Sequence, residues 1–234
     1  MKNRIWIIDC LRAFAIFSMI AYHLAYDLRT YYAFQIDVHD GLWKIFEQVV
    51  AGLFLLLVGW SFVLSWRQTP HWQKYTKRGA TILGYGFIVS AATFLFDPAT
   101  YVRFGILHLI GVSVMILPLF VRLRQFALIP ATIAAIIGIQ LRDGTASTPL
   151  FLPIGLTEPG FQSVDYFPLF PWFGAVLVGA AVGSALQNLG PSEAAHGKLK
   201  EAVTIVSRHS LLIYLVHQPL LLLLLRMTLG EARI

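Results

Sequence analysis

The sequence has little charge and almost no cysteine. Only 13% of its 234 residues are charged, whereas 57% are hydrophobic, and the hydrophobic residues form long runs separated by short basic clusters. A soluble domain of this length needs more polar surface, so the composition indicates an integral membrane protein. The single cysteine, Cys10, excludes an internal disulfide and a multi-cysteine metal site.

Several motifs of soluble enzymes are also missing. The sequence has no glycine-rich phosphate loop, no His/Cys spacing of a metal site, no GxSxG nucleophile elbow and no internal repeat. The net charge of +6 requires no nucleic-acid partner, because basic cytoplasmic loops and anionic lipid headgroups account for it. We therefore expect a bilayer around the protein, no bound metal and no nucleic-acid partner.

Seven apolar runs have about the length that crosses a bilayer. The stretch 147–167 is rich in proline and glycine and is predicted as a loop. The sequence predicts an all-α fold: one polytopic membrane helix bundle, a single domain over 1–234, with about seven transmembrane helices. The runs are 5–28, 46–65, 79–96, 104–121, 126–141, 168–187 and 205–225.

Basic residues in the connections predict the orientation. Eleven lie on one side of the predicted bundle and six on the other, with Arg12 left inside a span. Cytoplasmic loops carry an excess of Lys and Arg, so we expect the N-terminus in the cytoplasm and the C-terminus outside. The eleven are Lys2, Arg4, Arg67, Lys74, Lys77, Arg78, Arg122, Arg124, Lys198, Lys200 and Arg208, the last three in a predicted loop.

The first span carries four ionisable residues on one face. Arg12 and His23 are eleven residues apart, which brings them to within about 20° around a helix and about 16 Å along it. Asp9 precedes Arg12 by one turn and Asp27 follows His23 by one turn, so each basic group has an acidic neighbour. Charges at membrane depth usually face a protein interior or a watery cavity. Alternatively, Asp9 and Arg12 form a pair that snorkels to the headgroups, and His23 and Asp27 lie at the outer membrane–water interface.

The stripe suggests acid–base chemistry. An imidazole beside a carboxylate can act as a general base, because the carboxylate fixes the tautomer and stabilises the imidazolium. We therefore expect His23 to act with Asp27. Arg12, about three turns away, can hold a phosphate or carboxylate with its planar fork.

Sequence blocks along nearly the whole chain resemble a known family. The first helix, beginning "DCLRAFAIF", resembles the Arg/His signature of the transmembrane acyltransferase superfamily. The blocks further resemble the bacterial branch similar to the catalytic domain of heparan-alpha-glucosaminide N-acetyltransferase. They are "HDGLWKIFEQVVAGLFLLLVGWSF" (39–62), "RFGILHLIGVSVMIL" (103–117), "DYFPLFPWFGAVLVGAAVG" (165–183) and "SRHSLLIYLVHQPLLL" (207–222).

The resemblance implies transfer of an acetyl group from cytoplasmic acetyl-CoA to a hydroxyl or amine of a glycan or amino sugar across the cell (inner) membrane of a prokaryote. In the wider superfamily the arginine and histidine of the first helix are needed for activity, so the resemblance implies the same for Arg12 and His23. Heparan-alpha-glucosaminide N-acetyltransferase itself, which is a lysosomal enzyme, has asparagine at the position that matches His23. Its active histidine lies further along its chain, before a "WNGL" block. The related "HDGL" block begins with His39, near that histidine but out of register, so His39 remains a second candidate base.

Other polar residues are candidates for lining the cavity. We expect Asp9, Arg103 and His108 to join Arg12 in binding the donor, and Tyr214 and His217 to contact the acceptor. His108 and His217 can instead be hydrogen-bonded packing residues. Asp165 and Trp172 lie in an aromatic run that forms either an interfacial belt or a surface for a sugar. The basic residues at 67–78 and 122–124 are weak candidates for the CoA phosphates.

Two other functions fit the sequence. A small transporter or proton-linked permease would use the buried Arg/His/Asp set as a relay, although the internal repeat frequent in transporters is missing. A non-catalytic partner of another membrane enzyme is the third interpretation. The sequence leaves four questions open: which acceptor is used, whether transfer is to oxygen or nitrogen, whether an acyl-enzyme intermediate forms, and whether the protein is a homodimer.

Overall fold

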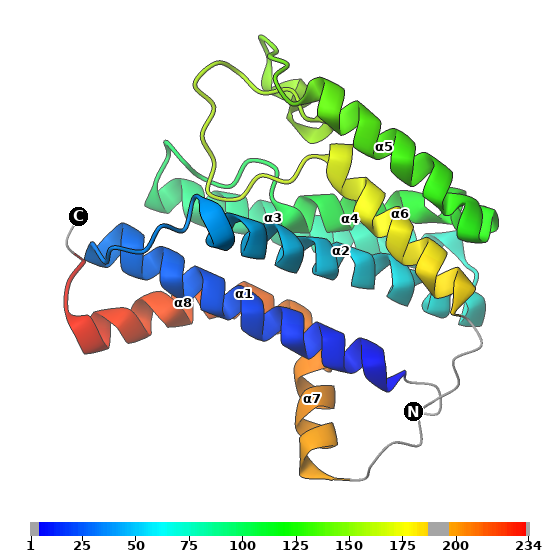
Figure 1. Cartoon of the computed structure of the whole chain (residues 1–234), viewed down its shortest axis with the longest axis horizontal. Helices are drawn as coiled ribbons and strands as arrows, with labels where there is room; N and C mark the ends of the chain where they lie inside the picture. Colours follow the sequence, from blue (N-terminus) through cyan, green and yellow to red (C-terminus); the bar gives the residue numbers. More distant parts are fainter. Residues whose placement is uncertain (1–4, 187–196, 233–234) are drawn as a thin grey trace. The chain divides into compact units, whose positions relative to one another are not determined.

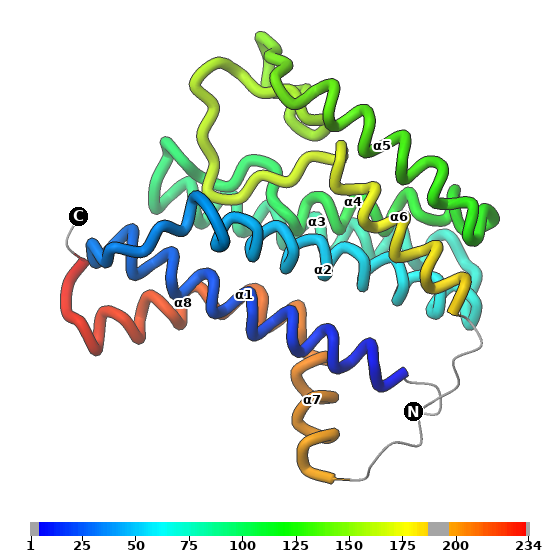
Figure 2. The backbone as a smooth tube through the Cα atoms, in the orientation of Figure 1, coloured from blue at the N-terminus to red at the C-terminus, as the bar shows by residue number. Residues whose placement is uncertain are grey.

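The structure is a computed structural model, which describes residues 5–186 and 197–232. The predicted all-α class is confirmed: these residues form helices and two isolated β-bridges, with no strand among them. Figure 1 and Figure 2 show the helices in chain order. They are α1 (Trp6–Tyr32), α2 (Gly41–Gln68), α3 (Trp72–Phe96), α4 (Ile106–Ile116), η1 (Leu117–Leu119), η2 (Val121–Ala127), α5 (Leu128–Leu141), η3 (Pro149–Ile154), α6 (Leu169–Ala185), α7 (Lys198–Arg208) and α8 (Ser210–Leu229).

Helices occupy every predicted span. Five helical segments in the described residues are long and apolar enough to cross a membrane, and two further apolar helices are shorter. The five are Trp6–Tyr32, Gly41–Gln68, Trp72–Phe96, Val121–Leu141 and Ser210–Leu229, and the shorter two are Ile106–Leu119 and Leu169–Ala185. The chain is an integral membrane protein.

Three sequence predictions need correction. The basic segment 198–208 is not a loop but the helix α7, because its apolar residues recur at helical spacing although the run is too short to span lipid. The span predicted over 205–225 is therefore broken at His209. The span predicted over 104–121 also changes from α-helix to 3₁₀-helix at Leu117. Pro118 follows there, and a proline has no backbone N–H with which to continue the α-helical hydrogen bonds.

The chain divides into two compact units, each described by itself. The first comprises Met1–Phe54 and Leu189–Ile234, and it contains α1, α7, α8 and the start of α2. Figure 1 shows α1 and α8 side by side and running in the same direction. Two hydrogen bonds agree with this direction, because Asp27 contacts Gln218 and Tyr32 contacts Gly230 further along both helices.

The second unit, Leu55–Asn188, packs its helices closely through glycines. A Cβ on Gly179 of α6 would overlap the Leu56 carbonyl of α2, and one on Gly183 would meet Trp60. This is the small-xxx-small spacing by which membrane helices approach each other. The pairing makes α2 and α6 parallel, since both residue numbers rise together.

Two further helix pairs of the second unit are antiparallel. Gly79 of α3 lies against Met115 of α4, whereas Gly86, further along α3, lies against His108, earlier in α4. In the same way Gly138 of α5 lies against Pro171 of α6, at the opposite end of that pair from the Gly174–Ala131 contact.

Candidate active site

The first cluster of the predicted stripe joins α1 to the end of α7. Nη1 of Arg12 donates a hydrogen bond to Oγ of Ser207 (3.0 Å), and Ser207 donates to Oδ1 of Asp9 (2.6 Å). Asp9 is 4% exposed and Ser207 is 2% exposed. The hydroxyl therefore connects the guanidinium with the carboxylate that lies one turn before it on α1, and it restrains both side chains.

Two histidines meet in the middle of α1 and α8. The rings of His23 and His217 lie edge to face with centroids 4.7 Å apart. Nδ1 of His23 is 2.9 Å from the Met19 carbonyl oxygen, and Nδ1 of His217 is 2.6 Å from that of Tyr214. A carbonyl oxygen only accepts, so each Nδ1 carries the proton and each Nε2 presents a lone pair. Each neutral ring therefore has Nε2 free to act as a base.

Three buried acceptor atoms without a hydrogen-bond partner lie between α1 and α8. They follow the line of contact between these two helices that also contains His23 and His217, which we call the seam. Nε2 of Gln218 donates to Oδ1 of Asp27 (2.7 Å), while Asp27 Oδ2, Gln218 Oε1 and His217 Nε2 have no hydrogen-bond partner in the structure. Asp27 is fully buried. Since buried polar atoms are normally paired, these three acceptors indicate a place for water or for a ligand with N–H or O–H groups.

The structure places Asp27 with Gln218 rather than with His23, whose Nδ1 uses a backbone carbonyl. The other neighbours of His23 are aromatic and polar. The Tyr22 ring lies edge to face with it, and the Tyr22 hydroxyl donates to Oε2 of Glu47 (3.2 Å) at the start of α2. Tyr214 lies beside His217, with ring centroids 5.6 Å apart.

His39, the second candidate base, is separate from this seam. It is exposed, in the connection before α2, and its ring lies edge to face with Tyr26, with centroids 5.8 Å apart. Nearby, Arg29 donates to the Ile36 carbonyl (2.6 Å) and pairs with Asp37 (3.5 Å). The connection is therefore tied back to the end of α1.

Four predicted site residues belong to the second unit, and His108 has a packing role there. Its Nδ1 accepts from the Gly105 backbone N–H (3.2 Å) and its Nε2 is 3.5 Å from Oγ of Ser90. It is 1% exposed, against the rings of Phe87 and Phe104. With both ring nitrogens engaged, His108 caps the start of α4 and packs it on α3.

Asp165 and Trp172 also have local partners. Both carboxylate oxygens of Asp165 accept from the Ile106 N–H (3.3 and 3.2 Å), at the positive end of the α4 dipole. The Trp172 ring packs on Phe167, with centroids 4.9 Å apart. These contacts favour a role in holding the connection before α6.

Arg103 lies between two aromatic rings. Its guanidinium carbon is 5.2 Å from the Tyr101 ring centroid and 4.9 Å from that of Phe161, and Nη1 is 3.9 Å from Glu158. Nε of Arg103 is buried without a hydrogen-bond partner. Stacking on aromatic rings suits the planar guanidinium and fixes its direction.

Two connections of the second unit contain groups with shifted pKa values. The Thr100 hydroxyl (2.6 Å) and the Ala99 N–H (2.9 Å) donate to Asp97 and lower the pKa of its carboxyl. Burial raises the pKa of Tyr166 to about 12, and its hydroxyl donates to the Leu152 carbonyl (2.8 Å). Both groups therefore keep one charge state throughout the neutral range.

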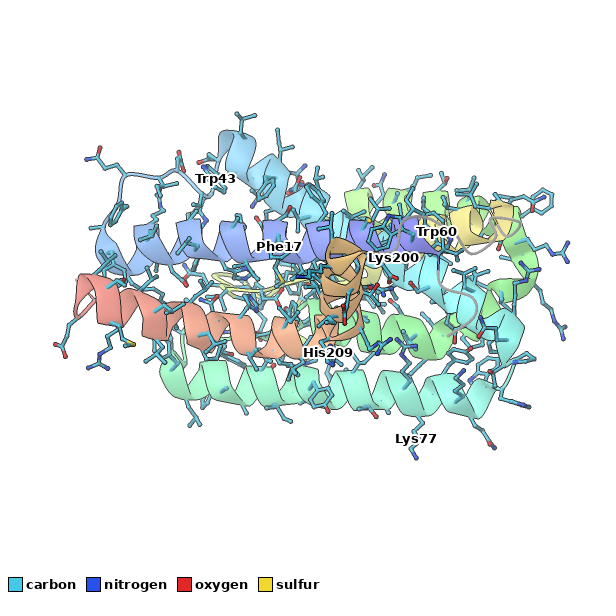
Figure 3. The ribbon with its side chains drawn as sticks, turned by 90° about the horizontal axis from the view of Figure 1, so that it is seen from below. Phe17, Trp43, Trp60, Lys77, Lys200 and His209 are labelled. Atoms are coloured by element: carbon cyan, nitrogen blue, oxygen red, sulfur yellow. The ribbon has the colours of Figure 1, made fainter. Side chains whose placement is uncertain are left out.

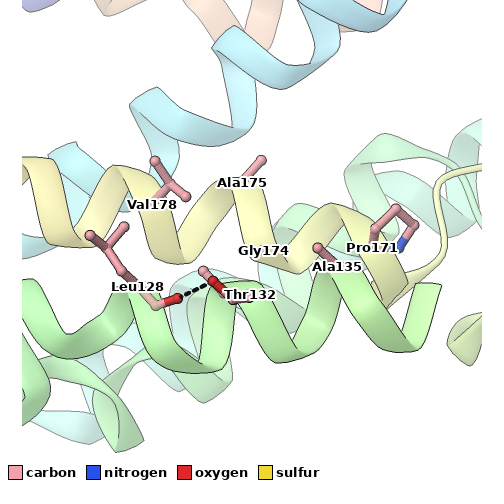
Figure 4. Close-up of a pocket in the computed structure, with 8 residues that line it drawn as sticks. Leu128, Thr132, Ala135, Pro171, Gly174, Ala175 and Val178 are labelled. Atoms are coloured by element: carbon pink, nitrogen blue, oxygen red, sulfur yellow. Dashed lines mark hydrogen bonds between the residues drawn. The ribbon is translucent and has the colours of Figure 1, made fainter. Parts of the chain in front are cut away.

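A groove of about 280 Å³ lies between α5 and α6 (Figure 4). Its one side-chain hydroxyl, that of Thr132, donates to the Leu128 carbonyl of its own helix (3.0 Å). The groove therefore presents an apolar surface, and its lining residues include no ionisable or nucleophilic side chain suited to catalysis. Its lining residues are Leu128, Ala131, Thr132, Ala135, Pro171, Gly174, Ala175 and Val178.

Two polar partners of the stripe come from far along the chain. Ser207 contacts Asp9 and Arg12 across roughly two hundred positions, as Gln218 does Asp27. The sequence alone gave no signal that Ser207 and Gln218 would contact these residues, because both lie far along the chain. Among the described residues, no three His, Cys, Asp or Glu side chains group as metal ligands.

Five helical segments of the described residues are apolar and long enough to span a membrane. Two of them, α1 and α8, bring together two imidazoles, a carboxylate and a restrained arginine. The chain is therefore an integral membrane protein with a polar site within its spans. The family model described as "Heparan-alpha-glucosaminide N-acetyltransferase, catalytic" matches residues 4–219. The chain therefore belongs to this family, as its sequence blocks predicted, and the family indicates a membrane acetyltransferase. Comparisons with curated proteins and with solved structures give no match.

Proposed function

We propose that the chain transfers an acetyl group from cytoplasmic acetyl-CoA to an amine or hydroxyl of a sugar-like acceptor on the other side of the membrane. The family supports the reaction class. The observation that carries the site assignment is the contact of His23 with His217, whose Nε2 atoms are both free to accept a proton.

The position of the seam suits a reaction inside the bilayer. At about 1.5 Å per residue, the 27 residues of α1 extend about 40 Å, against about 30 Å of hydrocarbon. If α1 is centred, Asp9 lies at one hydrocarbon boundary, Arg12 about 4 Å inside it and His23 about 9 Å inside the other. A donor bound at Arg12 would therefore have to extend into the membrane toward His23.

Helix directions support seven crossings and opposite sides for the two ends. Successive crossings alternate in direction, so the first and seventh are parallel, as α1 and α8 are. The second and sixth are likewise parallel, and the pairs α3–α4 and α5–α6 are antiparallel. With the excess of basic residues in the connections on the N-terminal side, this arrangement favours a cytoplasmic N-terminus in the inner membrane of a prokaryote.

Arg12 would bind an anionic group of the donor. Its guanidinium carries a permanent charge and suits a phosphate. Ser207 and the buried Asp9 restrain it, so less side-chain entropy is lost when the donor binds. Arg103, which belongs to the second unit, is a further candidate for an anionic ligand because its Nε has no partner.

His23 would act as the general base. The acceptor N–H or O–H gives its proton to Nε2 as the acceptor nitrogen or oxygen bonds to the thioester carbonyl carbon. The carbon–sulfur bond then breaks, and the imidazolium returns the proton to the leaving sulfur, which gives free CoA and the acetylated acceptor. An acceptor that arrives as an ammonium ion must lose one proton beforehand, and Nε2 of His217 would take it.

Asp27 would stabilise the imidazolium through space, one helical turn from His23. Its unpaired Oδ2, with Gln218 Oε1 and His217 Nε2, would accept hydrogen bonds from the acceptor or from water carried with it. Tyr214 lies beside His217 and would contact the acceptor. Binding both reactants in one seam contributes to the rate, because the attack becomes effectively unimolecular.

An acetyl-transfer assay tests the reaction. Purified protein is incubated with radiolabelled acetyl-CoA and a panel of amino sugars and neutral sugars, beside Arg12→Ala. We expect label in at least one sugar, and with Arg12→Ala a loss of donor binding. Label transfer to no acceptor, together with no CoA binding, would instead favour a transporter or a non-catalytic partner.

A further inference from the structure

Helix α7 has a surface that neither the membrane spans nor the proposed reaction uses. Figure 3 looks nearly along α7 while α1 and α8 run across the view, so α7 lies across the direction of the two spans. Lys200 lies over the Trp6 ring (6.0 Å), and Ser207 contacts Asp9. Since Asp9 lies near the hydrocarbon boundary when α1 is centred, α7 lies at that boundary too.

The side chains of α7 fall into three sectors at 100° per residue. Ser207 and Lys200 point to the first turns of α1. Glu201 and Arg208 are exposed in the next sector. The third sector is apolar and exposed: Leu199 is 76% exposed, Ile205 is 51% exposed, and Ala202 lies between them.

Three sectors are what a helix at a membrane surface requires, one each for protein, water and lipid. The charge also fits, because three basic residues and one acidic residue give α7 a charge of +2. Anionic headgroups attract basic residues that lie near the surface. Lys198 lies in the first turn within the angular range of the apolar sector, between Ile205 and Ala202. Its side chain is long enough to extend the ammonium to the headgroups.

We propose that α7 is an interfacial helix whose apolar sector, Leu199, Ala202 and Ile205, is buried at the headgroup–acyl boundary of an anionic leaflet. On α1, Phe14 and Phe17 are exposed apolar side chains as well. The helix thereby fixes the depth of Ser207, and through it that of Arg12. This inference stands independently of the proposed reaction.

Spin labels on α7 test the proposal. In a Cys10→Ser background, a nitroxide is attached at Leu199→Cys or Ile205→Cys, with Glu201→Cys as the matched control on the water sector. The protein is reconstituted in vesicles of phosphatidylcholine and phosphatidylglycerol, and relaxation by oxygen is compared with relaxation by a water-soluble nickel chelate. All three positions are exposed, so the labels leave the fold intact.

We expect oxygen to dominate at positions 199 and 205, with a label depth of roughly 5–10 Å, and the nickel chelate to dominate at position 201. Nickel access at all three positions would place α7 in water and overturn the proposal. Shielding of positions 199 and 205 from both reagents would overturn it too, because a protein surface would then cover the apolar sector.

Discussion

Removing the Ser207 hydroxyl should loosen Arg12 without changing its charge. In Ser207→Ala, Arg12 loses the 3.0 Å hydrogen bond to Oγ and Asp9 loses the 2.6 Å bond from it. A hydrogen bond to a charged group contributes about 1.5–3 kcal/mol. Water cannot readily replace the serine at Asp9, which is 4% exposed. We therefore expect the free energy of unfolding to fall by about 1.5–3 kcal/mol.

Donor binding should weaken in the same variant. If half of the lost free energy appears in the binding of CoA, its Kd rises about three- to tenfold. The assays are denaturant unfolding in detergent and equilibrium binding of radiolabelled CoA. Ser184→Ala is the matched control, because this buried hydroxyl donates to the Ala180 carbonyl of its own helix (2.9 Å). Equal effects of the two substitutions on CoA binding would refute the reasoning.

Three further predictions concern Gly179, His108 and Tyr166, which belong to the second unit. Gly179→Leu should destabilise the protein by about 1–3 kcal/mol or more through overpacking against Leu56, whereas Gly52→Ala, with open space around it, should be neutral or slightly stabilising in the same unfolding assay. His108→Ala should cost about 1–3 kcal/mol because it leaves the Gly105 N–H unpaired, yet the folded fraction should keep its activity per molecule, and a loss of all activity in folded protein would contradict a packing role. Because the pKa of Tyr166 is raised from 10.0 to about 12, the phenol contributes stability below pH 10 that is lost as pH rises toward 12, so melting temperatures should fall more steeply across that window in wild type than in Tyr166→Phe.

The polar face of α1 could be predicted because it depends on residues close in sequence. Asp9, Arg12, His23 and Asp27 share a helix, and helical spacing alone places them on one side. Which groups they contact depends on segments nearly two hundred residues away, such as Ser207. For this reason the sequence indicated a His23–Asp27 pair, whereas the structure pairs Asp27 with Gln218 and His23 with His217.

Helix α7 was mispredicted for a different reason. Long apolar runs indicate membrane spans, whereas an eleven-residue amphipathic helix has half of its surface polar. Its basic residues are typical of a cytoplasmic loop, although their spacing also places the apolar residues on one face. The polar roles of His108 and Asp165 could not be predicted from the sequence either, because both side chains bind backbone N–H groups at the start of α4, which only the fold brings close.

The most direct test of the account compares His23→Ala with His39→Ala in acetyl transfer, with CoA binding measured on the same preparations. We expect His23→Ala to lose transfer by about 10²–10⁴-fold, the usual contribution of a general base, while CoA binding is retained, and His39→Ala to remain active. Full activity of His23→Ala beside an inactive His39→Ala would contradict the assignment and place the base in the connection before α2.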